Sequence, residues 1–381
     1  MVKYKIGDIA EEISVRENNP ASSCYDKFVG LEHYIPGDVE IHNYGSTEKL
    51  NSAMKVFQAG DILIARRNVY LKRASVVNFD GITSGDSIVL RVKDRELSRI
   101  LPFVLNSDEF WDFADQYADG TMSKRLSPKT LMLYEFYAPE KSEQKEYADL
   151  LWAAYQTKRS YEKLLIQTDE LVKSQFIEMF GTYENTIYDV KKLEEICEPI
   201  KDGTHQTPTY TDDRVNGYLF LSSKDVTSRY VDWNHPMFIP PELHEELHKR
   251  IAPRKGDILL AKNGTTGIAA IVDRDIVFDI YVSLALLRPL KGINVKYLWQ
   301  AINMPETKAQ FDSRLKGVGV PNLHLGEIKQ ARIVVPPIEL QDRFANFLEQ
   351  SDKSKFEIQK SINRIDAVIK ALVEENSSNM A

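Results

Sequence analysis

The sequence predicts a mixed α and β protein in which two globular domains in tandem are each followed by a long helix. Three observations predict this class: an internal repeat, short β-rich runs between turn residues, and two long segments whose apolar residues step by three and four. The expected order is a globular domain over 1–139, a helix over 140–180, a second globular domain over 181–337, a helix over 338–376 and a disordered tail over 377–381.

The repeat consists of matching blocks at nearly constant spacing. The Gly-Asp-Ile-Leu sequence at 60–63 recurs at 256–259, which is 196 residues later. Ile6 and Leu193, which begin the two copies, are only 187 residues apart. The second copy therefore carries about nine more residues than the first before its Gly-Asp turn.

Short β-rich runs flanked by Gly, Asp and Asn predict the strands of both domains. In chain order, strands are expected over 61–65, 75–79, 88–92, 257–261, 269–272 and 281–287. Short helices are expected over 107–118 and 295–301.

Each domain leads through a proline into a long helix with a 3.5-residue apolar period, which keeps one seam of side chains facing a partner helix. If the two helices pair as an antiparallel coiled coil, the two equal domains are related by a pseudo-two-fold axis. Lys158 and Lys355 fall at equivalent seam positions and predict a polar layer that sets the register. The apolar seam is expected to contain Leu151, Tyr161, Leu165, Val172, Leu348, Ile358, Ile362, Ile365 and Ile369.

Composition excludes several classes of protein. With 43% hydrophobic and 28% charged residues the chain has the balance of a soluble globular protein, and no apolar run is long enough for a membrane span. Two cysteines, Cys24 and Cys197, cannot build a disulfide framework, so a cytoplasmic location is expected. The net charge of -7 means that any contact with DNA must be local.

One catalytic motif is present. His244-Glu245-Glu246-Leu247-His248 fits the zinc-protease pattern, in which two histidines one turn apart bind zinc. The segment lies between prolines and is polar on nearly every face, so a solvated surface helix without metal is expected. A phosphate-binding loop, a nucleotide-cofactor fingerprint and the tetrapeptide of adenine methyltransferases are all missing, which indicates a chain without catalytic activity of its own.

Polar and basic loops occupy matching places in the two copies, after each Gly-Asp strand and before each long helix. Arg and Lys can contact guanine or phosphate, Asn can pair with adenine, and Thr can approach either base edge. A single such loop is usually a solvated turn, but recurrence in both copies favours a DNA-binding surface. The candidates are Arg66, Arg67, Asn68, Tyr70, Lys72, Arg73, Lys124 and Arg125 in the first copy, and Thr204, His205, Lys224, Lys262, Asn263, Thr265, Thr266, Lys316 and Asn322 in the second.

Two further blocks carry a family resemblance. The sequence Ile-Val-Val-Pro-Pro-Ile-Glu-Leu-Gln enters the distal helix at 333–341, and Ser-Gln-Phe-Ile-Glu-Met-Phe-Gly closes the first helix at 174–181. Together with the duplicated Gly-Asp-Ile-Leu blocks, they make the whole chain resemble the specificity subunit of a type I restriction-modification system (HsdS). The first copy has Ala-Pro-Glu-Lys at 138–141 where a Pro-Pro pair is typical of the family, which leaves the start of its helix open.

The resemblance implies a non-catalytic subunit that binds a bipartite, asymmetric sequence in double-stranded DNA, each target-recognition domain reading one half-site. It also implies partners. Methyltransferase subunits would dock on the helices and methylate adenine with S-adenosylmethionine, and restriction subunits that use ATP and Mg would join for cleavage. No cofactor is expected in this chain itself.

Two alternatives from other classes remain. A coiled-coil adaptor between proteins would show no preference for DNA. A zinc hydrolase would contain stoichiometric zinc that is lost together with His244 and His248.

Overall fold

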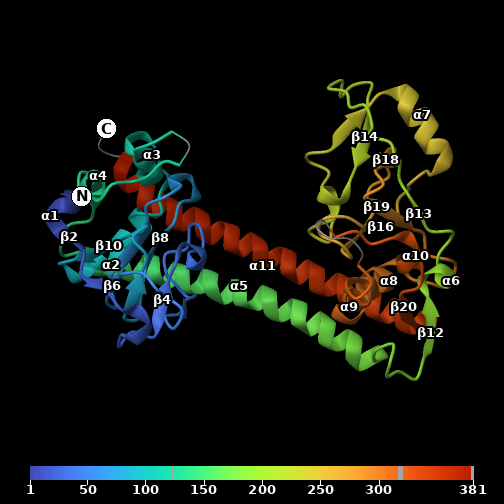
Figure 1. Ribbon diagram of the computed structural model, residues 1–381, viewed down its shortest axis with the longest axis horizontal. Helices are drawn as coiled ribbons and strands as arrows, with labels where there is room; N and C mark the ends of the chain where they lie inside the picture. Colours follow the sequence, from blue (N-terminus) through green and yellow to red (C-terminus); the bar gives the residue numbers. More distant parts are fainter. Residues whose placement is uncertain (122, 316–320, 379–381) are drawn as a thin grey trace. The chain divides into compact units, whose positions relative to one another are not determined.

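A computed structural model describes residues 1–121, 123–315 and 321–378 (Figure 1). The chain divides into two compact units, unit 1 with residues 1–164 and 358–381, and unit 2 with residues 165–357. The long helices are α5 (Gln144–Phe180) and α11 (Ile338–Ser378), so each unit contains one globular domain and a part of each helix.

The ends of these helices correct two expectations. Helix α5 begins at Gln144 and not at 140, since residues 141–143 form a turn ahead of it. Helix α11 continues to Ser378 through the first two residues of the expected tail, and residues 379–381 lie outside the described part.

The described residues of unit 1 form three antiparallel or mixed sheets. Strand β1 (Val2–Lys5) pairs with β11 (Glu135–Ala138), which joins the start of the domain to its end. A four-stranded sheet has the order β2 (Ala10–Ile13), β10 (Ser87–Val92), β7 (Ile62–Ala65) and β8 (Ala74–Val76). A five-stranded sheet has the order β3 (Arg16–Glu17), β6 (Met54–Phe57), β9 (Gly81–Thr83), β4 (Lys27–Val29) and β5 (Gly45–Ser46). The helices are α1 (Ile6–Ile9), α2 (Arg95–Val104), α3 (Asp108–Tyr117) and α4 (Pro128–Leu131).

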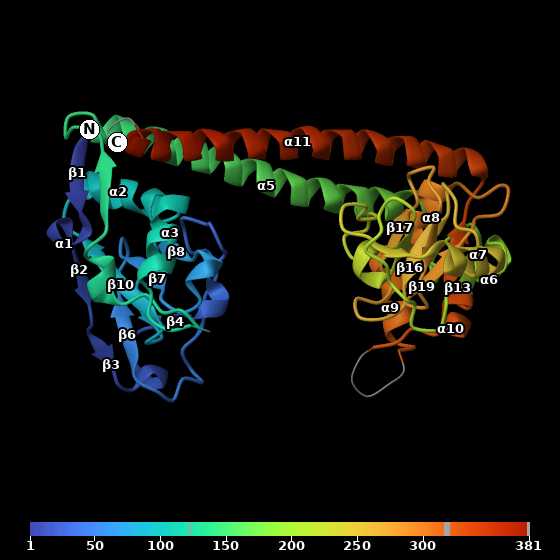
Figure 2. The ribbon, with the colours of Figure 1, turned by 90° about the horizontal axis from the view of Figure 1, so that it is seen from above.

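Unit 2 repeats this plan. Strand β12 (Asp189–Lys192) pairs with β20 (Arg332–Val335), and a four-stranded sheet has the order β13 (Lys201–Asp202), β19 (Leu284–Leu287), β16 (Ile258–Ala261) and β17 (Ala269–Ile271). Its third sheet has the order β15 (Met237–Ile239), β14 (Tyr218–Leu221) and β18 (Phe278–Ile280). The helices are α6 (Leu193–Ile196), α7 (Pro241–Arg250), α8 (Val295–Ile302), α9 (Pro305–Asp312) and α10 (Leu325–Lys329), and α8 covers the β16 sheet on the side of the long helices (Figure 2).

The duplicated strand order confirms the internal repeat. The expected helices match α3 and α8, and most expected strands agree with β7, β10, β16 and β17 within a residue or two. Two observed strands have other bounds than expected. Strand β8 covers Ala74–Val76, earlier than 75–79, and β19 begins only at Leu284 because Tyr281 bridges Thr204 instead.

The Gly-Asp block is a turn held by a buried carboxylate. Gly60 and Gly256 have φ of 93° and 91°, a left-handed conformation that glycine adopts without strain. Asp61 is 1% exposed and receives two hydrogen bonds of 2.7 Å from Arg91, and Asp257 receives bonds of 2.7 and 2.8 Å from Arg288. Each carboxylate thus ties the turn to the neighbouring strand, which explains why both copies carry the same block.

The glutamine at the start of each long helix has the same role in both units. Gln144 and Gln341 are each 1% exposed. Their amides donate to the carbonyls of Pro139 and Pro336, at 3.1 and 2.8 Å, just ahead of the helix. A buried amide needs such partners, so this pairing fixes where the domain passes into the helix.

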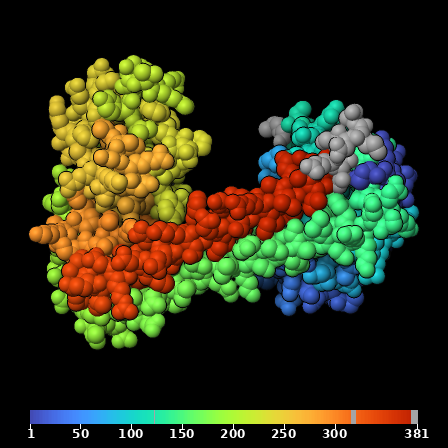
Figure 3. All heavy atoms as spheres, turned by 180° about the vertical axis from the view of Figure 1, so that it is seen from behind, coloured from blue at the N-terminus to red at the C-terminus, as the bar shows by residue number. Residues whose placement is uncertain are grey.

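In unit 1 the start of α5 and the end of α11 pack side by side and antiparallel (Figure 3). Lys158 forms an ion pair of 2.7 Å with Asp366. In unit 2, Lys355 forms an ion pair of 3.1 Å with Asp169. Both the two lysines and the two aspartates are 197 residues apart, so the two pairs are equivalent and confirm the polar layer expected in the seam.

All nine expected seam residues are at least partly buried. Leu151, Val172, Leu348 and Ile362 are buried, and Tyr161, Leu165, Ile358, Ile365 and Ile369 are partly buried. Among the described residues, every helix is either too short or too polar to span a bilayer.

Candidate nucleic-acid interface

In unit 1 the two candidate loops of the first copy meet and pair. The backbone N–H of Asn68 donates to Lys124 O at 2.9 Å, and that of Leu126 donates to Arg66 O at 2.9 Å. Arg67 and Arg125 face each other in this short antiparallel bridge. The loop after β7 and the segment before α4 therefore present their basic residues at one place.

Unit 2 brings together the equivalent loops in the same way. Asn263 and Asn322 form the antiparallel bridge, and the N–H of Leu323 donates to Lys262 O at 2.8 Å. Asn263 follows Arg67 by 196 residues and Asn322 follows Arg125 by 197, so the bridged positions are equivalent. One structural position thus holds two arginines in unit 1 and two asparagines in unit 2.

Asp86 holds the two arginines of unit 1. It forms an ion pair with Arg67, whose Nε lies 2.8 Å from Oδ1, and accepts a hydrogen bond from Arg125 Nη2 at 3.2 Å, while the two arginine side chains stay 47% and 39% exposed. A guanidinium has five N–H donors, and each arginine gives only part of them to Asp86. The remaining donors are held in place and open to a ligand.

Other candidates of unit 1 lie around this pair with ion-pair partners of their own. Lys124 Nζ lies 2.6 Å from Asp115, and Lys72 Nζ lies 2.5 Å from Asp108. Tyr70 is 67% exposed in the middle of the short helix Val69–Leu71. Asn68, whose φ is 54°, accepts a hydrogen bond from Ser123 at 3.1 Å.

Four candidates are buried and support the loops from beneath. Arg73 is 8% exposed and donates to Leu31 O at 3.2 Å and to Arg67 O at 3.0 Å, and burial lowers its pKa. The other three are Thr204, Lys262 and Thr266, which are 8%, 5% and 4% exposed. The sequence suggested direct DNA contact for these four, but such enclosed side chains hold the loops in shape.

Asp202 is the acidic centre beneath the loops of unit 2. Its carboxylate lies 2.6 Å from Lys262 Nζ, 3.3 Å from His205 Nε2 and 3.4 Å from Arg250 Nη2. Burial acts to raise the pKa of Asp202, but the hydrogen bonds from Lys262 and His205 outweigh it and the pKa lies below its ordinary value. Asp202 therefore remains a carboxylate that fixes these cations.

The remaining candidates of unit 2 are accessible. Asn263 and Asn322 are partly exposed, and His205, Lys224 and Thr265 are exposed. Lys316 lies outside the described residues.

The sequence did not single out Asp86, Asp202 or Arg250. A signal existed for Asp86, because it directly precedes the block at 87–90, whose strand pairs with β7 in a register that sets residue 86 opposite Arg66. No local pattern marks Asp202 or Arg250, because the contacts of Asp202 with Arg250 and Lys262 span 48 and 60 residues of the chain.

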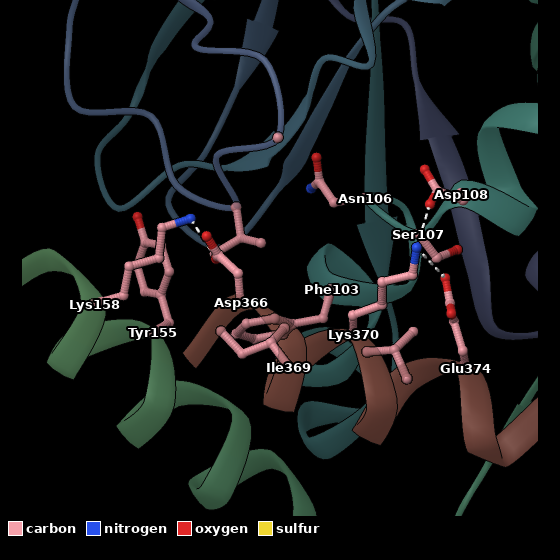
Figure 4. A pocket seen from close by; sticks show the side chains of 13 residues that line it. Phe103, Asn106, Ser107, Asp108, Tyr155, Lys158, Asp366, Ile369, Lys370 and Glu374 are labelled. Carbon is pink, nitrogen blue, oxygen red and sulfur yellow. Dashed lines mark hydrogen bonds and ion pairs between the residues drawn. The ribbon is translucent and has the colours of Figure 1, made fainter. Parts of the chain in front are cut away.

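A cavity of about 230 Å³ lies in unit 1, between the globular domain and the long helices (Figure 4). Lys370 lies 2.7 Å from Asp108 and 3.6 Å from Glu374, and Lys158 points to Asp366. Phe103 and Ile369 supply apolar lining. The charged groups that line this cavity pair with each other. The Lys370–Asp108 ion pair thereby joins the globular domain to helix α11.

The histidine motif differs from the solvated surface helix that was expected. Helix α7 buries His244 and Leu247, and the ring of Tyr218 stacks on His244 with centroids 3.6 Å apart. Asp279 of β18, which is 0% exposed, lies 2.6 Å from His244 Nδ1 and 3.3 Å from His248 Nδ1. Burial raises the pKa of Asp279, although its contacts with the two histidines oppose this. A third potential metal ligand is therefore present.

Comparison with known proteins places part of the chain in a described family. Residues 186–367 match the family described as Type I restriction modification DNA specificity domain. The specificity subunit of the EcoBI type I restriction enzyme from Escherichia coli is 28% identical over 166 residues, which are 43% of this chain and 34% of that protein. The match therefore spans about a third of that relative's length.

Two solved structures share the fold over nearly the whole chain. One is a chain from a structure on complex assembly and conformational transition of the type I R-M system, with TM-score 0.60, 17% identity and coverage of 98% of this chain and 97% of that one. The other is the S subunit of a type I restriction-modification system from M. genitalium, with TM-score 0.54, 14% identity and coverage of 98% and 95%. Residues 186–367 are thus similar to the type I restriction-modification DNA specificity domain, and nearly the whole chain shares the fold of these two structures.

Proposed function

We propose that this chain selects the DNA sequence for a type I restriction-modification complex, by binding a bipartite, asymmetric target with one half-site on each globular domain. The observation that carries the proposal is the bridged loop pair, which recurs at equivalent positions of both units with different side chains. Arg67 and Arg125 occupy it in unit 1, and Asn263 and Asn322 in unit 2.

The chemistry of these side chains supports different half-sites. Arginine donates two hydrogen bonds to O6 and N7 of guanine, and asparagine pairs with N6 and N7 of adenine in the major groove. Asp86 holds the arginines in place, Arg73 donates to the Arg67 carbonyl beneath them, and in unit 2 the buried Lys262 is held by its ion pair with Asp202. We therefore expect unit 1 to read guanine where unit 2 reads adenine.

The chain would act without chemistry of its own and in the cytoplasm, where DNA is accessible. Methyltransferase subunits would bring S-adenosylmethionine and methylate adenine, and restriction subunits would bring ATP and Mg. The net charge of -7 fits this division of labour, because partner subunits would then supply much of the positive charge that DNA phosphates require.

The outer faces of the helices support docking of methyltransferase subunits. Leu150 and Val368 are 50% and 51% exposed in unit 1, and Ile166, Leu171 and Phe356 are 66%, 53% and 68% exposed in unit 2. These exposed apolar side chains are the candidate contacts with a methyltransferase subunit. Leu171 and Val368 stand 197 residues apart at equivalent places, so two copies of one partner could use equivalent surfaces.

The test is to express the chain with the methyltransferase subunits of its host and to sequence the methylome with and without its gene. The expected result is one asymmetric bipartite motif with methylated adenine that disappears with the gene. An unchanged methylome, with no sequence preference of the purified complex in filter binding, would instead identify an adaptor between proteins.

A further inference from the structure

The inner face of helix α7 and strand β18 bring two imidazoles and one carboxylate together. His244 and His248 are one turn apart on α7, so both project from the same face of the helix toward Asp279. The three groups can each offer one ligand atom, and these atoms lie within 4.8 Å of one another.

The surroundings hold this cluster in position. Tyr218 of β14 stacks on His244 with an interplanar angle of 12°, and Phe220 of the same strand is paired in register with Asp279. His244 is 9% exposed and Asp279 is 0% exposed, while the side chain of His248 remains 31% exposed. The site is therefore built on three regular elements, with one open side through which an ion can enter.

Electrostatics favour a cation at this place. A buried carboxylate is costly unless a positive charge or several donors compensate it, and neutral imidazoles supply donors but no charge. Two imidazoles and a carboxylate are an established zinc ligand set, with ligand atoms about 2.0–2.2 Å from the metal. Neighbouring ligands of a tetrahedral ion would then be roughly 3.3 Å apart. The 3.3 Å between Asp279 and His248 Nδ1 matches this spacing, and the 2.6 Å between Asp279 and His244 Nδ1 would lengthen when an ion replaces the hydrogen bond.

We propose that His244, His248 and Asp279 bind one divalent transition-metal ion, with Zn²⁺ as the preferred occupant, and that this ion fastens α7 to β18. The fourth position is left to water. The role is structural: the ion joins a helix of the longer second copy to the strand beside it.

Metal binding would also stiffen the candidate DNA loop of unit 2. At the end of α7, Arg250 donates to Gly203 O at 3.3 Å. At the end of β18, Ile280 O accepts from the N–H of Thr204 at 3.2 Å, and a Cβ on Gly203 would lie only 1.8 Å from this oxygen. Helix α7 and strand β18, which the metal would hold together, therefore both contact the segment Gly203–Thr204. This consequence rests on the proposed function, whereas metal binding itself does not.

The experiment measures metal content and thermal unfolding of the untagged full-length chain. After incubation with Zn²⁺ and dialysis we expect about one ion per chain, and a melting temperature on the order of 5 °C higher with Zn²⁺ than with EDTA. Both effects should be lost in His248→Ala, whose residue is only half-buried, and in Asp279→Asn, which preserves side-chain size. His235→Ala is the matched control, since His235 is an 86% exposed histidine of the same unit, and it should retain the ion.

A wild-type chain that retains less than a tenth of an ion and melts equally with Zn²⁺ and EDTA would overturn the proposal, leaving a hydrogen-bonded cluster alone. Equal zinc content in His248→Ala would overturn it as well, by placing the ion elsewhere. Co²⁺ substitution gives a second readout, because a four-coordinate site would produce visible absorption that both variants lack. None of these measurements depends on DNA, so they can fail while the proposed function stands.

Discussion

At the scale of single residues, the side chains around the bridged loop pair are of two kinds. Exposed side chains can contact DNA, and buried side chains hold the loops in shape. Arg67 and Arg125 keep much of their surface exposed while Asp86 restricts their motion. Arg73 lies beneath and holds the Arg67 carbonyl. A residue's basic character is therefore a poor guide to its role, and its burial and partners decide whether it can contact a base.

We predict that replacing Arg67 and Arg125 with alanine relaxes one half of the methylated motif at its guanine. Each lost bidentate contact should reduce discrimination by about 1–3 kcal/mol. Methylome sequencing measures this directly. Arg95→Ala, which removes an exposed arginine away from the loops, is the control and should leave the motif intact. Loss of specificity in both halves would contradict the assignment.

Asp108 links a candidate loop to helix α11 and makes stability sensitive to acid. Hydrogen bonds from Lys370 and Lys72 lower its pKa to about 2, from an ordinary value of 3.8. The depressed pKa means that its contribution is fully present above about pH 4 and is lost as the pH falls toward 2. Because the side chain is 51% exposed, solvent screening should limit this contribution to about 0.5 kcal/mol.

Asp108→Asn should therefore lower the melting temperature slightly at pH 6, and the difference from wild type should shrink between pH 4 and pH 2. Glu109→Gln is the control, since Glu109 is the exposed acidic neighbour on the same helix. A difference that stays constant down to pH 2 would rule out the ion pair as its cause.

At the scale of elements, helices and domains that follow a periodic or repeated sequence pattern were predictable. Contacts between residues far apart in the chain were not. The heptad pattern needs only the local chain, and it correctly predicted α5, α11 and the equivalent Lys158 and Lys355 layer. The repeat likewise predicted two equivalent globular domains, and the strand orders of their four-stranded sheets match. Asp279 was missed as a partner of the histidines because it lies 35 residues from His244 and carries no signal of its own.

We predict that Ile362→Asp disrupts the helix pair. Ile362 is 5% exposed in the seam, and an unpaired charge there costs on the order of 3 kcal/mol. The expected result is reduced helicity by circular dichroism and loss of the complex with methyltransferase subunits on gel filtration. Asn363→Asp introduces the same charge at the next, exposed position and should preserve assembly. Unchanged assembly of Ile362→Asp would refute the seam.

At the scale of the whole molecule, each compact unit combines one globular domain with parts of both long helices. In unit 1 the core contains Phe103 and Leu151 and is joined by Ile369, Leu372 and Val373 from the end of α11. The globular domain of unit 1 is therefore not an isolated module. Its exchange succeeds only if the incoming domain keeps the apolar contacts with α11.

We predict that replacing residues 1–139 with the corresponding domain of another family member changes one half of the methylated motif and leaves the other half unchanged. The physical reason is that the bridged loops of unit 2 rest on Asp202, Lys262 and Arg250, all of which lie within that unit. Donor domains with apolar residues at the positions that contact Ile369 and Leu372 should assemble normally, and donors with polar residues there should be less stable. The reciprocal exchange of 181–337 should change only the other half. A palindromic motif in the parent, or a change of both halves after a single exchange, would contradict the assignment of one half-site to each domain.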